Sequence, residues 1–187
     1  MKRIILFASG SGSNVENIAQ YFNHDPSISI ACVFTNKRDA KVIDRCNRLG
    51  INCLYFNKVA FTQTSCVIDI LKGMQPDLIV LAGFLLKIPE ALVQQFPNKI
   101  INIHPALLPK YGGKGMYGMH VHKAVKDHKE AETGITIHYV NEHYDEGGII
   151  HQATTKVSEI DTPEDIASKV HQLEYEHFPK IIAQLLS

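Results

Sequence analysis

The sequence predicts an α/β fold in which helices cover both faces of a mostly parallel sheet, with an antiparallel addition toward the C-terminus. Three observations lead to this prediction. Short apolar runs alternate with amphipathic stretches over the first half of the chain. The apolar runs are nearly continuous, which is typical of strands that are buried on both faces. Further along, two strand-like runs follow each other without an intervening helix.

Four apolar runs have the length and composition of buried strands, and they comprise residues 3–8, 28–34, 78–82 and 100–103. Four stretches between these runs repeat their apolar residues at helical spacing, and they comprise residues 15–22, 40–49, 62–72 and 89–96. Strands that are joined through helices run parallel, so these elements form the parallel part of the sheet. In the third helix, Thr62 is the expected N-cap and Gly73 the expected stop.

The C-terminal third of the chain has a different pattern. Residues 134–140 and 149–157 are strand-like, and the polar segment between them ends in Asp145-Glu146-Gly147-Gly148. Because no helix separates these two strands, they are expected to pair antiparallel. The final helix is expected to begin after Thr162, since a proline follows it and is preorganised for the first helical position. Pro179 is expected to kink or interrupt this helix.

The composition is that of one globular domain, residues 1–187, because 45% of the 187 residues are hydrophobic and 20% are charged. The 19 basic and 19 acidic residues balance, so binding to nucleic acid is not expected. The apolar run after Arg3 ends at Ser9, too short for a signal peptide or a membrane span, and a cytoplasmic location is expected. The four cysteines show no Cys-x-x-Cys spacing and are expected to be reduced structural thiols: Cys32, Cys46, Cys53 and Cys66.

A turn rich in glycine and serine, Ser9-Gly10-Ser11-Gly12-Ser13-Asn14, lies between the first predicted strand and the first predicted helix. Small residues let backbone N–H groups gather around an anion, and the positive end of the following helix points at it. The turn is therefore either a phosphate site or simply a tight connection. A dinucleotide site is disfavoured because Val15 stands where the third glycine belongs, and Gly115 after Lys114 excludes a Walker sequence.

Asn102, His104 and Asp145 are the strongest catalytic candidates. Side chains alternate along a strand, so Asn102 and His104 can point into the same cleft. An amide can donate to a developing oxyanion, and a histidine near a carboxylate stays protonated to higher pH and can donate too. This combination suits attack on a carbonyl carbon. Ser and Cys are absent from residues 102–122, so the nucleophile is expected to belong to the substrate.

Each of these residues also has a structural alternative. A histidine before a proline can hydrogen-bond its own loop, and Asp145 before two glycines can form a turn. Five further histidines raise the alternative of a metal centre, but their spacing matches no zinc motif and no metal is expected: His120, His122, His138, His143 and His151. The segment Leu81 to Pro89 is either a slot for a flat heterocycle or ordinary strand-to-helix packing.

Four segments, taken in order, resemble the folate-dependent formyltransferases. They are Ser9-Gly10-Ser11-Gly12-Ser13-Asn14, Leu81-Ala82-Gly83-Phe84, Asn102-Ile103-His104-Pro105-Ala106-Leu107-Leu108-Pro109 and Asp145-x-Gly147. The glycine turn narrows the resemblance to the phosphoribosylglycinamide formyltransferases of purine synthesis, and the resemblance covers nearly the whole chain. It implies a Rossmann-like fold and transfer of a formyl group from 10-formyltetrahydrofolate, a co-substrate, to the amine of phosphoribosylglycinamide (GAR). The products would be formyl-GAR and tetrahydrofolate.

The resemblance also implies roles for individual residues. Asn102 and His104 would be catalytic, with Asp145 supporting the histidine and helping to move protons while the amine attacks directly and forms a tetrahedral intermediate. The phosphate and the glycinamide side of the substrate would be bound by Gly12, Ser13, Asn14 and Glu174. The folate would be bound by Leu85, Leu86, Lys87, Ile88 and Asn102. The expected partners are these two small molecules alone, and a monomer or weak homodimer is expected.

The chain departs from the family pattern near Thr64, where relatives commonly carry an arginine. A lysine would have to replace it, although lysine offers a point charge in place of a bidentate fork, and the candidates are Lys87, Lys110 and Lys114. The glycine-rich loop 111–118 is longer than expected and is interpreted as a cover over the phosphate.

Two other enzymes that act on formyl-folate and one non-catalytic binding protein are the alternatives. Methionyl-tRNA formyltransferases add a C-terminal nucleic-acid-binding domain, whereas this chain stops at Ser187. Formyltetrahydrofolate hydrolases usually carry an N-terminal regulatory domain, whereas this chain begins at its first strand. The hydrolase and a non-catalytic phosphosugar-binding module stay open as alternatives.

Overall fold

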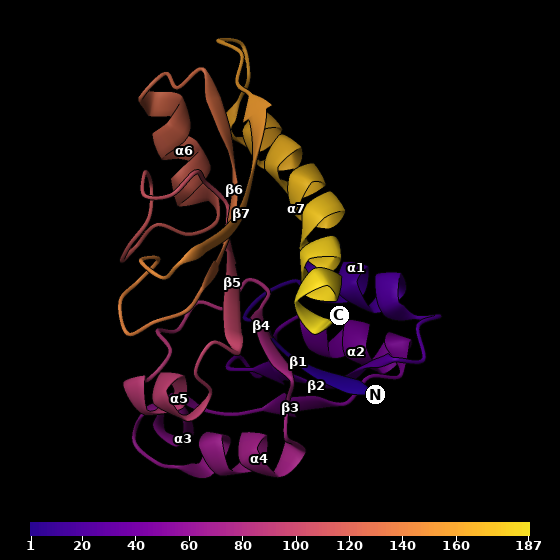
Figure 1. The fold of residues 1–187 in the computed structure, drawn as a ribbon. Coiled ribbons are helices and arrows are strands. Elements are labelled where there is room, and N and C mark those ends of the chain that lie inside the picture. The colour runs from indigo at the N-terminus through magenta and orange to yellow at the C-terminus, as the bar shows by residue number, and fades with distance from the viewer. The chain divides into compact units, whose positions relative to one another are not determined.

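The computed structural model describes residues 1–187 and contains seven strands and seven helices (Figure 1). The chain divides into two compact units. Unit 1 consists of residues 1–101 together with Leu186 and Ser187, and unit 2 consists of residues 102–185. Strand β5 (Ile100–His104) begins in unit 1 and ends in unit 2.

Unit 1 contains the parallel part of the sheet. Its strands are β1 (Lys2–Phe7), β2 (Ile28–Thr35), β3 (Cys53–Tyr55) and β4 (Leu78–Leu81). They lie in the order β3-β2-β1-β4, with β5 next to β4, and the pairs β1–β2, β1–β4 and β2–β3 are parallel. The four predicted buried strands are confirmed. Strand β3 was not predicted, because three residues are too few to display a periodic pattern.

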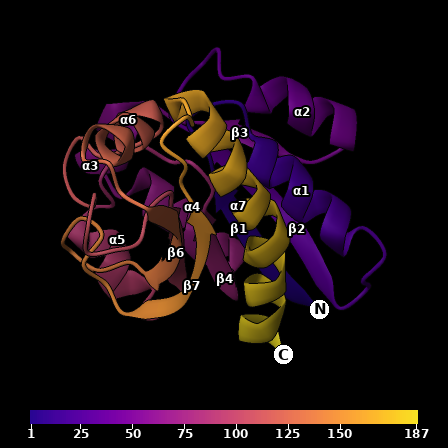
Figure 2. The ribbon, with the colours of Figure 1, turned by 90° about the horizontal axis from the view of Figure 1, so that it is seen from above.

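The helices of unit 1 cover both faces of its sheet. They are α1 (Ser13–Phe22), α2 (Val42–Leu49), α3 (Lys58–Thr62), α4 (Cys66–Met74) and α5 (Glu90–Gln95). Helices α1 and α2 lie on one side of the strands, and α3, α4 and α5 lie on the other (Figures 1 and 2). The reason is that crossovers are right-handed. The chain moves outward from β1 to β3 and then returns to β4, so its helices change face.

The helix predicted for residues 62–72 is α4, which begins at Cys66, and the separate short helix α3 ends at Thr62. Asn57 caps α3, because its side-chain oxygen accepts a hydrogen bond from the Ala60 N–H at 2.8 Å. Thr62 ends α3 instead of starting a helix, and its hydroxyl donates back to the Lys58 carbonyl at 2.9 Å. Gly73 lies inside α4, which ends at Met74. Both boundary predictions were therefore wrong.

The largest aromatic cluster of unit 1 lies on the face that α3 covers. The Phe7 and Phe34 rings are stacked with centroids 5.0 Å apart, and the Phe61 and Phe84 rings meet edge to face at 5.5 Å. Phe56 completes the cluster. Because Phe84 is held in this core, it anchors the segment that follows β4.

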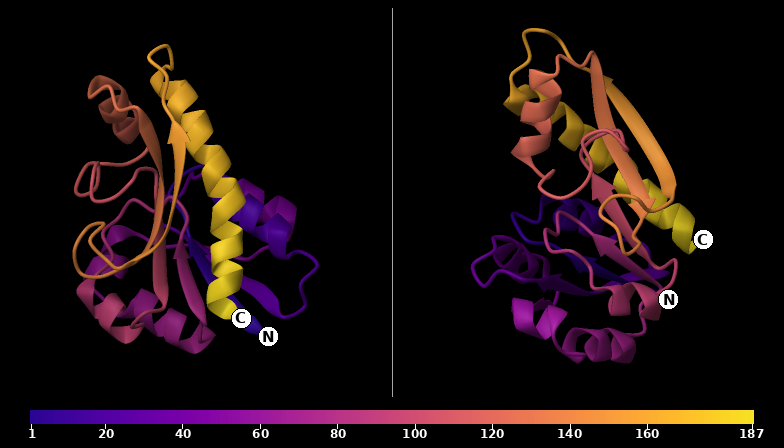
Figure 3. Two further views of the ribbon diagram at one scale, coloured as in Figure 1. Left: turned by 45° about the horizontal axis from the view of Figure 1, so that its top comes forward. Right: turned by 90° about the vertical axis from the view of Figure 1, so that its left-hand side faces the viewer.

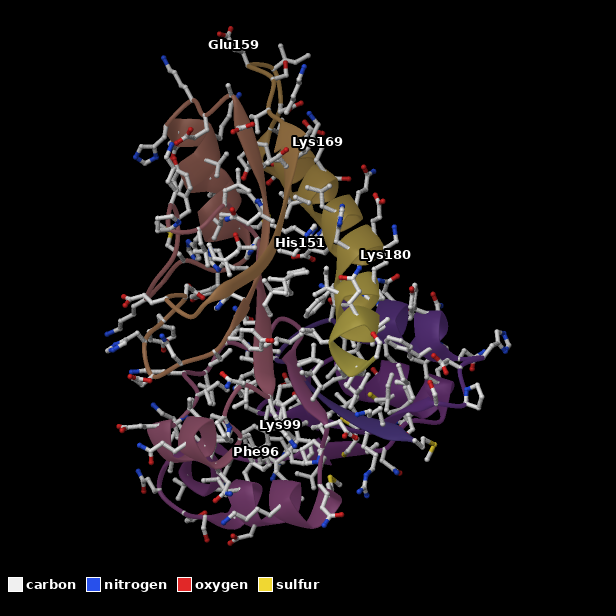
Figure 4. The ribbon with its side chains drawn as sticks, in the orientation of Figure 1. Phe96, Lys99, His151, Glu159, Lys169 and Lys180 are labelled. Carbon is white, nitrogen blue, oxygen red and sulfur yellow. The ribbon has the colours of Figure 1, made fainter.

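Unit 2 contains the antiparallel part of the fold. Strands β6 (Glu132–Tyr139) and β7 (Ile149–Lys156) pair antiparallel, and β6 lies next to β5. Helix α6 (Met119–Asp127) lies on one face of this pair and α7 (Pro163–Leu186) on the other (Figure 3). His151 of β7 points toward α7 (Figure 4), where its Nε2 lies 2.9 Å from His177 Nδ1. The predicted fold class, a Rossmann-like α/β sheet with an antiparallel C-terminal addition, is confirmed.

Helix α7 begins as predicted and continues where an interruption was expected. The Asp165 N–H donates to the Thr162 hydroxyl at 3.1 Å, and the Thr162 N–H donates to the Asp165 carboxylate at 2.9 Å. Pro179 lies inside the helix and does not interrupt it. Phe178 and Ile182, on either side of it, are fully buried, and their packing holds the turn. Neither α7 nor any other helix is long and apolar enough to cross a membrane.

Candidate functional site

The three predicted catalytic side chains meet in unit 2. Asn102 and His104 lie on β5, and Asp145 lies in the loop between β6 and β7. His104 Nδ1 is 3.6 Å from Asp145 Oδ2. Asn102 does not reach the carboxylate directly. Its amide nitrogen lies 3.1 Å from Nε2 of His138, and that same Nε2 lies 3.7 Å from Asp145 Oδ1.

The loop that carries Asp145 is closely packed. Asp145 has a left-handed backbone with φ of 57°. A Cβ at Gly147 would lie 1.7 Å from the Tyr139 carbonyl oxygen, so only glycine fits there. The Tyr139 N–H donates to the Gly148 carbonyl at 2.9 Å and closes the loop onto the end of β6. This packing places the carboxylate beside both histidines.

His138 is a site residue that sequence reasoning had grouped with metal-ligand candidates. It lies on β6 and is 2% exposed. Its Nδ1 lies 2.8 Å from the Tyr139 carbonyl oxygen, so Nδ1 carries the proton and donates. In the neutral ring Nε2 must then accept, and the Asn102 amide donates to it. His138 therefore determines which way the Asn102 amide faces. The available signal was an inward-facing histidine on a strand predicted to belong to the sheet.

His104 is buried, and its Nε2 donates to the Tyr111 carbonyl oxygen at 2.7 Å. Burial lowers the pKa of His104, although the Asp145 carboxylate and the Tyr111 hydrogen bond both oppose the shift. The expectation of a histidine protonated to higher pH was therefore wrong, because desolvation outweighs the carboxylate. The neutral ring carries its proton on Nε2, and Nδ1, which faces Asp145, is the atom that takes up a further proton.

The Asp145 carboxylate stays ionised. Burial alone would raise its pKa, but the neighbouring His138 and His104 rings and the Gly113 N–H together lower the pKa below its usual value. The Gly113 N–H donates to Asp145 Oδ2 at 2.8 Å. His104 and Asp145 thus both bind the backbone of the glycine-rich loop 111–118.

The same loop engages one of the lysines considered as an arginine substitute. Lys110 Nζ lies 2.9 Å from Glu130 Oε1, and the Tyr111 hydroxyl donates to the same oxygen at 2.9 Å. Lys114 is exposed and lies within the loop. The ion pair with Glu130 makes Lys110 a poorer candidate for binding an anionic ligand than Lys114.

The predicted phosphate turn lies in unit 1. Gly12 precedes α1 with φ of 74°, and a Cβ there would lie 2.4 Å from a Val42 methyl group, so two independent constraints require glycine. No side chain caps the N-terminus of α1. The Ser9 hydroxyl donates to the Asn36 side-chain oxygen at 2.6 Å and accepts from the Leu85 N–H at 2.9 Å. Ser9 therefore joins the phosphate turn to the segment predicted to hold folate.

Within that segment, residues alternate between outward and inward positions. Leu85 is 43% exposed and Lys87 is exposed, whereas Ile88 is buried. Leu86 is half-buried. Gly83, with φ of 76°, makes the turn that redirects the chain after β4. The segment thus exposes the Leu85 side chain, while Ile88 at its other end is buried and anchors it.

Two further polar residues of unit 2 are buried. Glu174 of α7 is buried, and its Oε2 lies 3.9 Å from His171 Nε2. His122 of α6 is 2% exposed, and its Nδ1 has no hydrogen-bond partner. Burial, with His171 and His104 nearby, lowers the pKa of His122 to about 4. The histidines weighed as metal ligands do not form a cluster that could hold an ion.

Comparison with protein families gives one match across most of the chain. Residues 2–182 match the family described as formyl transferase. The phosphoribosylglycinamide formyltransferase of Bacillus subtilis is 39% identical over 193 residues, which are 100% of this chain and 95% of the relative. The chloroplastic phosphoribosylglycinamide formyltransferase of Arabidopsis thaliana is also 39% identical, over 98% of this chain. This chain spans only 65% of that relative's length.

Solved structures of proteins with these names are also similar to this chain. The glycinamide ribonucleotide transformylase 1 of Geobacillus kaustophilus superposes with a TM-score of 0.90 at 33% identity, covering 100% of both chains. The phosphoribosylglycinamide formyltransferase of Streptococcus pneumoniae superposes with a TM-score of 0.88 at 30% identity, again over 100% of both chains.

Proposed function

The chain belongs to the formyl transferase family, and from this membership we propose that it is a phosphoribosylglycinamide formyltransferase. It transfers the formyl group of 10-formyltetrahydrofolate to the amine of GAR, a step of purine biosynthesis, and releases formyl-GAR and tetrahydrofolate. One observation carries the proposal. An amide, an imidazole and a carboxylate meet at the end of β5 through His138, and residues 102–122 contain no serine or cysteine to act as a nucleophile.

The reaction begins with attack of the neutral GAR amine on the formyl carbon. The carbonyl oxygen of the formyl group gains negative charge as the tetrahedral intermediate forms. One hydrogen of the Asn102 amide is donated to His138, which leaves the second hydrogen for this oxygen. Asn102 is thus an oxyanion donor whose orientation is set before substrate arrives.

His104 has two ways to contribute. Its Nδ1 faces the ionised Asp145 and accepts the proton that the attacking amine must lose, directly or through water. Its Nε2 donates to the Tyr111 carbonyl, so Nε2 becomes a second oxyanion donor only after loop 111–118 moves away. Because the two substrates are held together, proximity supplies much of the remaining acceleration.

The substrate-binding roles are assigned to individual residues. The phosphate of GAR binds at the turn formed by Gly12, Ser13 and Asn14, where small residues and the N-terminus of α1 suit an anion. Glu174 contacts the glycinamide side of the same substrate. The folate binds along residues 85–88 and contacts Asn102. Lys114 is the preferred lysine for the role of the missing arginine.

One assay separates this function from its alternatives. The protein is incubated with 10-formyltetrahydrofolate, with and without GAR, and release of tetrahydrofolate is followed. We expect release that depends on GAR. Release without GAR would identify a hydrolase, and no release at all would identify a non-catalytic phosphosugar-binding protein. The cytoplasmic location and the monomeric or weakly dimeric state stay predictions.

A further inference from the structure

Helix α2 contacts the predicted phosphate turn at its backbone carbonyls. The Val42 N–H, at the start of α2, donates to the Gly10 carbonyl at 3.1 Å. Three residues further along the helix, the Arg45 Nε–H donates to the Ser11 carbonyl at 2.6 Å. The next carbonyl, that of Gly12, accepts a hydrogen bond from the first turn of α1 at 3.0 Å. Three consecutive carbonyls of the turn therefore already have donors.

The direction of these carbonyls matters for an anion. A peptide unit that points its carbonyl oxygen at a phosphate repels it, whereas one that points its N–H at the phosphate attracts it. The first N–H groups of a helix have no intrahelical partner, and no side chain caps α1. Hydrogen bonds that hold the carbonyls of the turn therefore preorganise it for an anion at the N-terminus of α1.

Arg45 is the only side chain among the three donors, because the other two are backbone N–H groups. Its guanidinium also pairs with the Glu16 carboxylate of α1, and both side chains are partly buried. Helix α2 lies beside α1 (Figures 1 and 2). One guanidinium on α2 thus binds both the turn and the helix that follows it.

Glu16 would oppose the binding of an anion if it were unpaired. Its carboxylate lies in the first turn of α1, near the end of the helix at which the phosphate is proposed to bind. Arg45 pairs with Glu16 Oε2 and Arg48 pairs with Oε1, so two positive charges offset one negative charge. Arg48 differs from Arg45 in one respect, because it donates to Glu16 and not to the turn.

We propose that Arg45 is a positioning residue for the substrate phosphate. It acts through the turn and not through contact with the phosphate: it holds the Ser11 carbonyl and the Glu16 carboxylate, so that N–H groups stay directed at the anion. The inference rests on the proposed function, because the phosphate is that of GAR. The phosphate is chemically unchanged in the reaction, so this contribution is the same for substrate and transition state. Its loss should therefore appear in KM and not in kcat.

Steady-state kinetics on the full chain test this role. In Arg45→Met the Ser11 carbonyl loses its donor, and we expect the KM for GAR to rise about tenfold while kcat stays within about twofold of the wild type. Arg45→Lys keeps the charge but has a methylene group in place of the Nε–H, so it should recover little of the loss. A wild-type KM in Arg45→Met, or complete recovery in Arg45→Lys, would overturn the proposal.

Arg48→Met is the matched control. It removes the same charge from the same carboxylate, while the Ser11 carbonyl keeps its donor. We expect the KM for GAR to equal that of the wild type. If Arg48→Met raises KM as much as Arg45→Met does, loss of charge is the cause and the positioning role is refuted. Circular dichroism checks that each variant is folded. Should Arg45→Met unfold, Arg45→Lys takes its place, and a wild-type KM in that variant would overturn the proposal.

Binding of ribose 5-phosphate separates this inference from the proposed function, because it needs no formyl transfer. Isothermal titration calorimetry should give the same Kd for the wild type and Arg48→Met. The Kd of Arg45→Met should be higher by the same factor as its KM for GAR. Equal Kd values in all three proteins, or no binding to any of them, would overturn the role of Arg45. Failure of the proposed function appears differently, as absent formyl transfer in a wild type that binds ribose 5-phosphate through Arg45.

Discussion

The Asn102 amide donates one hydrogen to His138, and its second hydrogen can be donated to a ligand. The hydrogen bond to His138 thus fixes the orientation of an uncharged side chain. The Nδ1–H of His138 is in turn held by the Tyr139 carbonyl. His138 is therefore a positioning residue that acts through Asn102. A chain of two part-buried hydrogen bonds orients the group that faces the developing negative charge.

Replacing His138 should reduce turnover more than substrate binding. In His138→Phe the Asn102 amide loses its acceptor and its orientation, and kcat is expected to fall about tenfold, equivalent to about 1.4 kcal/mol. His138→Gln keeps a side-chain acceptor and should recover part of that loss. Steady-state kinetics on folded protein, checked by circular dichroism, separate this effect from unfolding. Wild-type kcat in both variants would contradict the positioning role.

Asn102 and His104 should each contribute strongly to turnover. Losing one oxyanion donor costs on the order of 3 kcal/mol of transition-state stabilisation. Asn102→Ala and His104→Ala are therefore each expected to lower kcat at least about a hundredfold while the fold is kept. The measurement is kcat at saturating GAR and 10-formyltetrahydrofolate. If both variants turn over at a rate comparable to that of the wild type, the catalytic assignment is wrong.

Asp145→Asn should change the pH–rate profile in a defined direction. Asp145 raises the pKa of His104 against the larger lowering by burial, so removing its charge lowers that pKa further. Since His104 must be neutral to accept a proton at Nδ1, the acidic limb of the kcat profile should move to lower pH as the maximum rate falls. A limb that stays in place in the variant would remove Asp145 from this role.

At the scale of elements, the β6–β7 pair holds Asp145 in place, and the close approach of these strands depends on glycine. A Cβ at Gly134 would lie 1.9 Å from the Ala153 carbonyl oxygen of β7. Gly73, inside α4, has no atom within 4 Å of the position its Cβ would occupy. Close packing of the two strands therefore requires glycine at position 134, whereas no neighbouring atom requires it at position 73.

Alanine at these two positions should have opposite effects on stability. Gly134→Ala forces the strands apart and is expected to lower the free energy of unfolding by about 1–3 kcal/mol. Gly73→Ala removes a flexible residue from a helix and should raise it by up to about 1 kcal/mol. Urea unfolding at constant m-value measures both. A Gly134→Ala protein as stable as the wild type would contradict the strand contact described above.

For the whole molecule, the 19 basic and 19 acidic residues cancel, so net charge repulsion contributes little near neutral pH. Buried histidines contribute to the pH dependence in mildly acid solution. His122 has a pKa of about 4 in the folded protein, against an ordinary value of 6.5. The unfolded chain thus binds more protons between these two values, and stability is lost as pH falls through this window.

The size of this loss can be measured by urea unfolding as a function of pH. Full protonation of His122 in the unfolded chain alone corresponds to about 3 kcal/mol. His104, whose pKa burial also lowers, adds to the loss with the same sign. His122→Gln should show a flatter dependence of the free energy of unfolding on pH than the wild type. Equal slopes for the two proteins between pH 6.5 and about 4 would refute the assignment.

Sequence reasoning identified the main strands and the antiparallel pair for local reasons. Strands buried on both faces must be nearly continuous in apolar residues, and alternation places Asn102 and His104 on one side of β5. The helix start predicted at Thr62 was wrong because threonine hydroxyls can bond backward as well as forward along a helix. The stop predicted at Gly73 was wrong because Gln75, and not the glycine, takes the left-handed position after α4. Where a helix begins and ends therefore depends on the conformation of the neighbouring turns.

Only the tertiary structure decided which groups the catalytic residues meet. His138 lies far from Asn102 in sequence and reaches it because β6 pairs beside β5. The lowered pKa of His104 follows from burial, which no local pattern records. The sequence by itself thus determined the identity and order of the reactive groups, because residue type and spacing are properties of the chain before it folds. Their hydrogen-bond partners and protonation were decided by folding, because both depend on distances and desolvation that exist only once the strands have paired.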